Sequence, residues 1–309
     1  MSEKKVLLSI VSITFNHESF IEDALKSWLE QDIDLDFEIV IGDDASHDGT
    51  VNIIKQYQLK YPGKIHLIEN PVNLGHQRNL LNTLKMSKGD FIAICAGDDF
   101  WIDPLKLQKQ LKVFSQNPNC KMVYTNCYFL YGEEISTNTL VDYSKNFSFG
   151  IEDYLSQKYI TIAPTSMIRR FDFDELGKES FLNSTLEDEY LFTYLIKDGG
   201  SIFYLADKTG CYRVHPKGIN SQQQTIKQLY YKLSTLNNLR FEFVNNKKNR
   251  IIIDSFIELN IDRLYNYTFD GFHGLSKLDL FKLIFQYKKG ILIDYRFYYN
   301  WFFKRLIGK

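Results

Sequence analysis

Apolar runs and amphipathic stretches alternate along the first 120 residues of the chain. Residues 6–14 form a β-rich apolar run, and after it Ile21, Leu25 and Trp28 recur at the spacing of one helix face. The same alternation then repeats, with further strands expected at 37–41, 65–68 and 91–95. Strands joined to helices by short links predict a mostly parallel central sheet flanked by helices. The fold class is therefore α/β.

Polar residues mark where two of the predicted helices begin. Ser19, followed three residues later by Glu22, has the pattern of a capping box. Thr185 stands where an N-cap is expected before an acidic stretch, which places Asp188 in the first helical turn. The helix macrodipole favours a carboxylate that stays ionised at that position.

The strand signals stop near the polar stretch 216–224. We predict a first domain at 1–221 and a helical C-terminal region at 222–309, where apolar stripes at helical spacing take over. In the second half of the first domain, strands are expected at 122–130, 160–168, 201–206 and 210–215, and helices at 151–159 and 186–197.

Composition narrows the class of protein. With 44% hydrophobic and 24% charged residues, the chain can bury a sizeable core. A formal net charge of -1 argues against a protein that binds nucleic acid through an overall positive charge. The four cysteines lie in apolar stretches without zinc-like spacing, so we expect reduced core residues. The run at 6–14 is too short for a membrane span or a clean secretion signal, which predicts a cytoplasmic location.

Residues 276–309 differ from the rest in charge. They carry eight Lys and Arg against two Asp, interleaved with ten aromatic residues. Basic and aromatic side chains together suit the headgroup region of an anionic membrane, which predicts peripheral contact there. The alternatives are a helix that packs on the first domain or on a second subunit, and RNA binding, for which no recognisable motif is present.

Carboxylates stand at the predicted strand ends, whereas the usual phosphate-binding loops are missing. The chain has no G-x-G-x-x-G after its first strand and no G-x-x-x-x-G-K-[ST], which argues against dinucleotide oxidoreductases and P-loop enzymes. The pairs Asp43-Asp44 and Asp98-Asp99 follow the second and fourth strands. Side-by-side carboxylates suit Mg²⁺ or Mn²⁺ that also touches a substrate diphosphate.

Four short motifs follow one another between residues 9 and 99. They are SIVSITFN at 9–16, EIVIGDDASHDGT at 38–50, NLG with RN at 73–79, and GDD at 97–99. Together they closely resemble the ordered motifs of family 2 glycosyltransferases. The resemblance runs from about residue 6 to about 221, and it rests on order and spacing, since no single motif is decisive. It implies a GT-A (nucleotide-diphospho-sugar transferase) fold with a nucleotide-binding half at about 1–120 and an acceptor half at about 121–221.

The resemblance assigns the nucleotide sugar to the strand ends. It implies that the first strand end, Thr14, Phe15 and Asn16, holds the base together with Asp44, and an aromatic face with a carboxylate fits uracil. Phe15 stands where Tyr is common in the family, so a phenol hydroxyl contact is lost, and Ile13 replaces a more usual Pro.

The paired carboxylates at 98–99 receive separate roles from the same resemblance. It implies that Asp98 contacts ribose and that Asp99 binds the metal, Mn²⁺ or Mg²⁺. His215 lies in a stretch similar to the family's Y-R-x-H-P, as a metal ligand, a diphosphate contact or a partly buried structural His. Arg78 is either a phosphate contact or a surface residue.

Asp188 lies in a segment, LEDEY, that resembles the family's general-base segment. The resemblance implies an inverting transferase that moves a sugar from a nucleotide sugar, most simply a UDP-sugar, to a hydroxyl of a glycan or undecaprenyl-linked acceptor. It also implies bacterial surface polysaccharide or glycolipid assembly at the inner face of the cytoplasmic membrane. Two rivals remain: a nucleotide-binding scaffold without turnover, and a sugar-phosphate nucleotidyltransferase, which should have a Gly-rich loop after the first strand.

Overall fold

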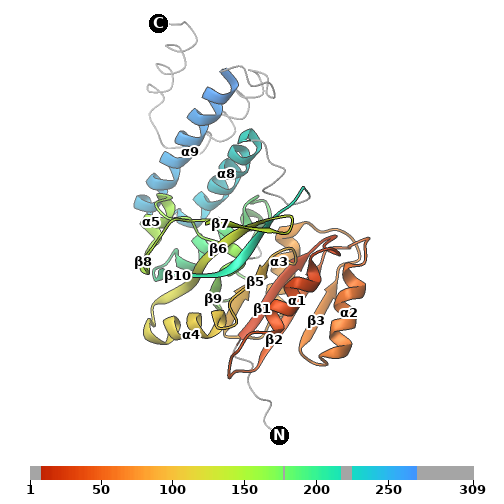
Figure 1. The fold of residues 1–309 in the computed structure, drawn as a ribbon. Helices are drawn as coiled ribbons and strands as arrows, with labels where there is room; N and C mark the ends of the chain where they lie inside the picture. Colours follow the sequence, from red (N-terminus) through yellow and green to blue (C-terminus); the bar gives the residue numbers. More distant parts are fainter. Residues whose placement is uncertain (1–7, 177, 217–224, 270–309) are drawn as a thin grey trace, which may run out of the picture.

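The computed structural model of the protein describes residues 8–176, 178–216 and 225–269, and a single mixed sheet with helices packed on it forms its centre (Figure 1). The strands are β1 (Leu8–Thr14), β2 (Phe37–Asp43), β3 (Ile65–Glu69), β4 (Phe91–Ile94), β5 (Phe100–Trp101), β6 (Cys120–Tyr131), β7 (Glu134–Thr139), β8 (Phe147–Phe149), β9 (Met167–Arg169) and β10 (Ser201–Val214). The helices are α1 (Ile21–Leu29), α2 (Thr50–Lys60), α3 (His76–Met86), α4 (Lys106–Gln116), α5 (Ile151–Leu155), α6 (Glu179–Leu182), α7 (Glu187–Ile196), α8 (Thr225–Leu239) and α9 (Lys247–Phe269), with short 3₁₀ turns at Ala163–Thr165 and Arg240–Phe243.

The sheet runs in the order β3-β2-β1-β4-β9-β6-β10-β5, with β7 beside β6 and β8 beside β10. Parallel pairings join β3, β2, β1 and β4, and a further one joins β6 to β10. β9 lies antiparallel between β4 and β6. Helices α1, α2 and α3 connect the first parallel group, so the carboxyl ends of its strands share one edge. The predicted α/β fold with a mostly parallel central sheet is confirmed.

Strands β1 and β2 show why the first half was predictable. Every residue of β2 is buried, and β1 is buried apart from Ile13, so both strands are covered on two faces. A strand covered on both faces appears in sequence as a nearly continuous apolar run, which the buried Ser9 and Ser12 interrupt in β1 and Glu38 interrupts in β2. The very short strands β5 and β8 give no such signal.

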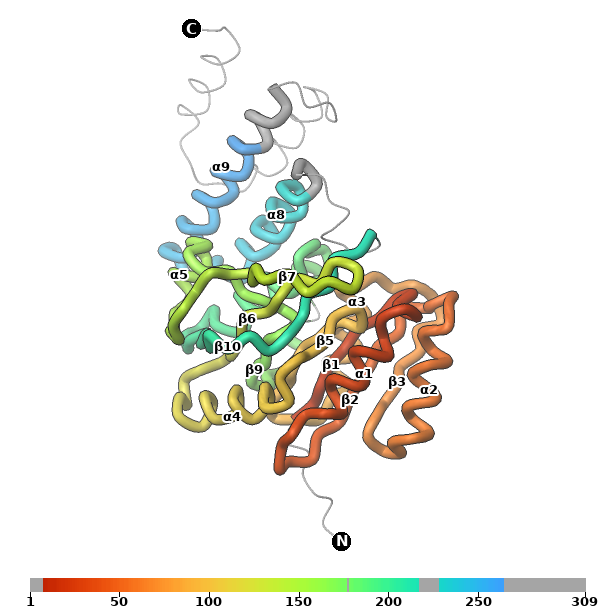
Figure 2. The backbone as a smooth tube through the Cα atoms, viewed as in Figure 1, coloured from red at the N-terminus to blue at the C-terminus, as the bar shows by residue number. Residues whose placement is uncertain are grey.

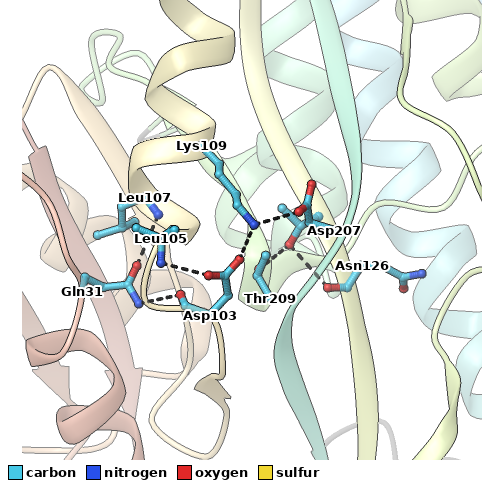
Figure 3. Close-up of polar contacts among 9 residues, drawn as sticks. Gln31, Asp103, Leu105, Leu107, Lys109, Asn126, Asp207 and Thr209 are labelled. Atoms are coloured by element: carbon cyan, nitrogen blue, oxygen red, sulfur yellow. Dashed lines mark hydrogen bonds and ion pairs between the residues drawn. The ribbon is translucent and has the colours of Figure 1, made fainter.

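Strand β10 departs from the prediction of two strands at 201–206 and 210–215. It is one strand, and its register against β6 shifts twice between Leu205 and Gly210. In this irregular stretch Asp207 meets Lys109 of α4 at 2.8 Å, and Lys109 also contacts Asp103 at 2.7 Å (Figure 3). Asp103, before the start of α4, is thus connected to Asp207 of β10 through Lys109.

Two predicted helix starts are wrong in detail. Helix α1 begins at Ile21 with Phe20 as its N-cap and no side-chain cap, so Ser19 and Glu22 form no capping box there. Helix α7 follows Leu186, and Thr185 does not cap it. The helix predicted at 151–159 is also shorter, because α5 ends at Leu155.

Helices α8 and α9 confirm the helical character predicted beyond residue 222. They lie side by side, and their buried side chains join one core cluster with α7 and β6 (Figures 1 and 2). Leu233 and Ile257 are fully buried in that cluster together with Leu191 of α7. The basic-aromatic stretch 276–309 lies outside the described residues.

Candidate active site

The carboxyl ends of β1, β2 and β4 bring three of the predicted clusters together. The Asp44 amide donates to the Thr14 carbonyl at 2.9 Å, and the Gly97 amide donates to the Ile13 carbonyl at 3.1 Å. A side chain on Gly97 would meet Thr14 Oγ1 at 3.0 Å and Ile21 at 2.9 Å, so glycine permits this close approach. The end of β1 therefore lies directly between the two acidic pairs.

Asp44 is buried, and its carboxylate holds the loop that precedes α3. Oδ1 accepts hydrogen bonds from the Leu74 amide at 2.8 Å and from Asn70 Nδ2 at 3.2 Å, while Oδ2 accepts from the Gly75 amide at 2.9 Å. A carboxylate offers about four acceptor positions, so Oδ2 keeps one for a ligand. Asp43 instead accepts from Ser46 within the turn that follows β2.

Phe15, Asn16 and Arg78 occupy different positions around this edge. The Phe15 ring is 40% exposed and meets His47 edge-on. Asn16 has a positive φ of 56°, and its Oδ1 accepts from the His47 amide at 2.8 Å, which fixes the loop after β1. Arg78 lies exposed on α3. Phe15 and Arg78 are thus available to a ligand, whereas Asn16 shapes the backbone.

His215 contacts Asp98, not Asp99. His215 Nε2 lies 3.1 Å from Asp98 Oδ2, and His17 Nε2 lies 3.7 Å from the same oxygen. Burial opposes the charge of Asp98, but the hydrogen bond from His215 and the neighbouring His17 outweigh it, so the pKa of Asp98 lies below its ordinary value. His17 was not singled out from the sequence, where its position after Thr14-Phe15-Asn16 was the one available signal.

Asp99 faces the protein interior. It is 4% exposed, and its Oδ1 accepts from the Arg213 amide at 2.8 Å, which joins the end of β4 to β10. Burial and the adjacent charge of Asp98 raise the pKa of Asp99 well above its ordinary value. The two neighbouring carboxyl groups therefore differ. Asp98 contacts the two histidines, whereas Asp99 holds the backbone of β10 through the Arg213 amide.

Asp98, His215 and His17 are residue types that fit a divalent metal. A carboxylate oxygen and imidazole nitrogens suit Mn²⁺, and Nδ1 of both histidines is buried without a hydrogen-bond partner. Among the described residues, however, no three His, Cys, Asp or Glu side chains are already spaced to hold an ion. The donor set fits a metal once the Asp98–His215 hydrogen bond opens.

Asp188 lies half-buried in the first turn of α7, as predicted. It lines a cavity of about 80 Å³ together with Ile13, Ala96 and Pro164, so the cavity reaches the ends of β1 and β4. Burial, then the charge of Glu187, raises the pKa of Asp188 to about 7. This outcome differs from the expectation that the macrodipole keeps the group ionised.

The start of α7 is held from two sides. Glu187 Oε2 lies 3.1 Å from His76 Nε2 at the start of α3, and Glu189 forms an ion pair with Lys232 of α8. The Leu186 amide donates to Thr235 Oγ1 of α8 at 2.9 Å. Sequence reasoning missed these contacts, which join residues at least 43 positions apart.

In the part of the chain that the structure describes, no helix combines the length and apolarity needed to cross a membrane.

Relatives of this chain include proteins of Mycobacterium tuberculosis and Shigella flexneri. A 224-residue segment is 29% identical to an uncharacterized protein of Mycobacterium tuberculosis, covering 72% of this chain and 63% of the relative, so the chain spans less than two thirds of that protein. A dTDP-rhamnosyl transferase, RfbG of Shigella flexneri, is 26% identical over 261 residues, which cover 82% of this chain and 88% of RfbG.

Solved structures show the same fold at low identity. S. aureus TarS 1-349 in complex with UDP-GlcNAc has a TM-score of 0.62 at 18% identity, over 84% of this chain and 73% of TarS. The mannosyltransferase PcManGT from Pyrobaculum calidifontis, in complex with GDP-Man and Mn²⁺, has a TM-score of 0.57 at 18% identity, over 83% of this chain and 71% of PcManGT. The sequence model for glycosyl transferase family 2 matches residues 9–177, more than half of the chain. The chain therefore belongs to glycosyl transferase family 2.

Proposed function

We propose that the protein is an inverting, metal-dependent glycosyltransferase that uses a UDP-sugar and a hydroxyl acceptor. One observation carries the proposal: Asp188 and Ala96 line the same cavity, and Ala96 lies two residues before Asp98. A carboxylate that can accept a proton thus lies close to the strand end where a diphosphate and its metal would bind. This proximity supports a single displacement at a sugar carbon, in which the base and the leaving group lie on either side of that carbon.

The nucleotide base occupies the space between Phe15 and Asp44 in this proposal. The exposed Phe15 ring offers a stacking face, and the remaining acceptor position on Asp44 Oδ2 suits the N3–H of uracil. The UDP-GlcNAc complex of TarS supports a UDP-sugar as the donor. Because PcManGT binds GDP-Man and RfbG is named a dTDP-rhamnosyl transferase, GDP- and dTDP-sugars are also included in the donor screen below. Arg78 contributes a positive charge for the phosphates.

Asp98 and His215 are the proposed metal ligands, with His17 beside them. This revises the roles implied by the sequence motif, where Asp99 was the metal ligand, because His215 contacts Asp98 and Asp99 is committed to the Arg213 amide. When bound, a Mn²⁺ or Mg²⁺ ion would neutralise the negative charge of the departing diphosphate. Asp99 keeps the role of holding β10 against this strand end.

Asp188 is the proposed general base. Its ionised carboxylate takes the proton of the acceptor hydroxyl while that oxygen attacks the anomeric carbon, and the bond from this carbon to the diphosphate oxygen breaks. UDP leaves with the electron pair of the broken bond, and the sugar configuration inverts. The reaction needs no covalent sugar intermediate.

The acceptor is proposed to be a glycan or an undecaprenyl-linked glycan of the bacterial surface. The composition of residues 276–309 supports peripheral contact with an anionic membrane, where such acceptors are built. The family and the rhamnosyl transferase relative support a role in surface polysaccharide assembly.

A donor screen tests the proposal. The protein is incubated with UDP-, GDP- and dTDP-sugars plus Mn²⁺ or Mg²⁺ and an acceptor extract, and release of nucleoside diphosphate is measured. Wild type should release UDP, and Asp188→Asn should lower the rate at least about a hundredfold. Asp153→Asn, the same exchange in the first turn of α5, is the matched control because its carboxylate pairs with Lys158 at the surface. Binding of UDP without release from any donor would favour a scaffold instead.

A further inference from the structure

Helix α3 touches the loop that leads into α7 through its first two residues. His76 Nε2 lies 3.1 Å from Glu187 Oε2 and 3.4 Å from the Thr185 carbonyl. Gln77 Nε2 donates to the Ser184 carbonyl at 2.6 Å. This junction joins the nucleotide-binding half to the residue immediately before the proposed general base.

His76 is held in place from its other side by Asp44. The amides of Leu74 and Gly75, the two residues before His76, donate to the two oxygens of that carboxylate. Gly75 has a φ of 84°, in the left-handed region where glycine fits, and this conformation directs the chain into α3. The imidazole therefore projects from a fixed backbone position.

Several charged or titratable groups face Asp188. They are Glu187 and Glu189 on its own helix, Lys232 on α8, His76 on α3 and Tyr154 on α5. Lys232 is paired with Glu189, which leaves His76 as the group in contact with Glu187. The negative charge of Glu187 disfavours ionisation of Asp188, so a positive charge on His76 offsets that effect.

The contact with Glu187 favours the protonated form of His76. Burial lowers its pKa, but the hydrogen bond and the charge of Glu187 outweigh burial, and the pKa of His76 lies above its ordinary value of 6.5. The two partners are partly shielded, with side-chain exposures of 28% and 20%. Their contact is therefore less screened than a surface ion pair.

We propose that His76 is a positioning residue for transfer: by pairing with Glu187 it fixes the start of α7 and offsets the negative charge that adjoins Asp188. The inference rests on the proposed function of Asp188 as general base. It concerns two residues, His76 and Glu187, for which the family motifs quoted above imply no role.

The test compares pH profiles of kcat/KM for UDP release. His76→Gln keeps a donor for Glu187 but removes the positive charge, so the rising limb should move to higher pH by about half a unit, the size of one neighbouring charge in a partly solvated site. Glu187→Gln should move it to lower pH, and the double variant should return it toward wild type. Gln77→Leu removes a neutral contact of the same junction, so it should lower the rate without moving the limb.

A second readout does not depend on turnover. The imidazole of His76 is titrated by NMR, and its pKa should lie above 6.5 in wild type and fall in Glu187→Gln. An active wild type whose limb stays in place in His76→Gln would overturn the inference and leave the proposed function standing. A His76 pKa that Glu187→Gln does not lower would also overturn it. Absence of release from every donor would overturn the proposed function, and the role of His76 with it.

Discussion

Asp188→Asn should lower the transfer rate at least about a hundredfold and make the protein more stable at neutral pH. The pKa of Asp188 is raised from its ordinary value of 3.8 to about 7, first by burial and then by Glu187. A carboxyl group with a raised folded-state pKa ionises more readily in the unfolded chain. The folded state therefore loses stability as pH rises from about 4 to about 7, and the cost stays constant above that range. Asparagine has the same shape and never ionises.

The size of the effect follows from the shift. About three pKa units at roughly 1.4 kcal/mol each give an upper limit of about 4 kcal/mol in the free energy of unfolding. Asp188 is only half-buried, so solvent screening reduces this to about 2 kcal/mol at pH 8. Below pH 4 both forms are neutral, and the difference should vanish.

Urea unfolding followed by circular dichroism measures the difference. Wild type and Asp188→Asn are compared at pH 8 and at the lowest pH where both still fold, and Asp153→Asn serves as the surface control with no expected change. In the transfer assay, wild-type kcat/KM should rise about tenfold between pH 6 and pH 8, because Asp188 must be ionised to accept a proton. A variant no more stable than wild type at pH 8, or one that transfers sugar at the wild-type rate, would refute the reasoning.

Three other outcomes test the donor site and the membrane contact. Asp98→Ala should weaken Mn²⁺ binding in the presence of UDP at least about tenfold, as measured by electron paramagnetic resonance. Asp99→Asn should leave Mn²⁺ affinity unchanged, since an amide oxygen still accepts from the Arg213 amide. If instead Asp99→Asn weakened Mn²⁺ binding and Asp98→Ala did not, Asp99 would be the metal ligand. Phe15→Ala should weaken UDP binding by about 1–2 kcal/mol in calorimetry, and an unchanged affinity would place the base elsewhere. Replacing the Lys and Arg of 276–309 with Gln should reduce flotation with anionic vesicles but not with neutral ones, and equal flotation would remove the membrane proposal.

The sequence predicted the first half of the fold well because its elements are regular. Strands such as β1 and β2 are buried on both faces and give mostly apolar runs, and the helix between them buries a single stripe. The short strands β5 and β8, with two and three residues, carry no period to detect. At the register shifts inside β10, polar residues interrupt the apolar pattern, and the sequence therefore predicts two strands where the structure has one.

The site was harder to predict than the fold. Sequence motifs located Asp98 and Asp99, but two adjacent residues at a strand end point in different directions, and only the contacts with His215 and Arg213 separate their roles. For Asp188 the macrodipole contributes up to about 1 kcal/mol at a helix start, whereas burial of a charge costs several, so burial decides its pKa.

The environment of the proposed base depends on residues beyond the predicted domain boundary at 221. Thr235 accepts the Leu186 amide, and Lys232 neutralises Glu189 one residue after Asp188. Without α8, Glu189 would lose its partner beside a half-buried carboxyl group, and the repulsion would raise the proton affinity of Asp188 further. Removal of α8 would also remove the buried Leu233 and leave a cavity beside α7 in the shared core. The proposed role of Asp188 as general base therefore requires a unit that extends through α8, even though the family model ends at residue 177.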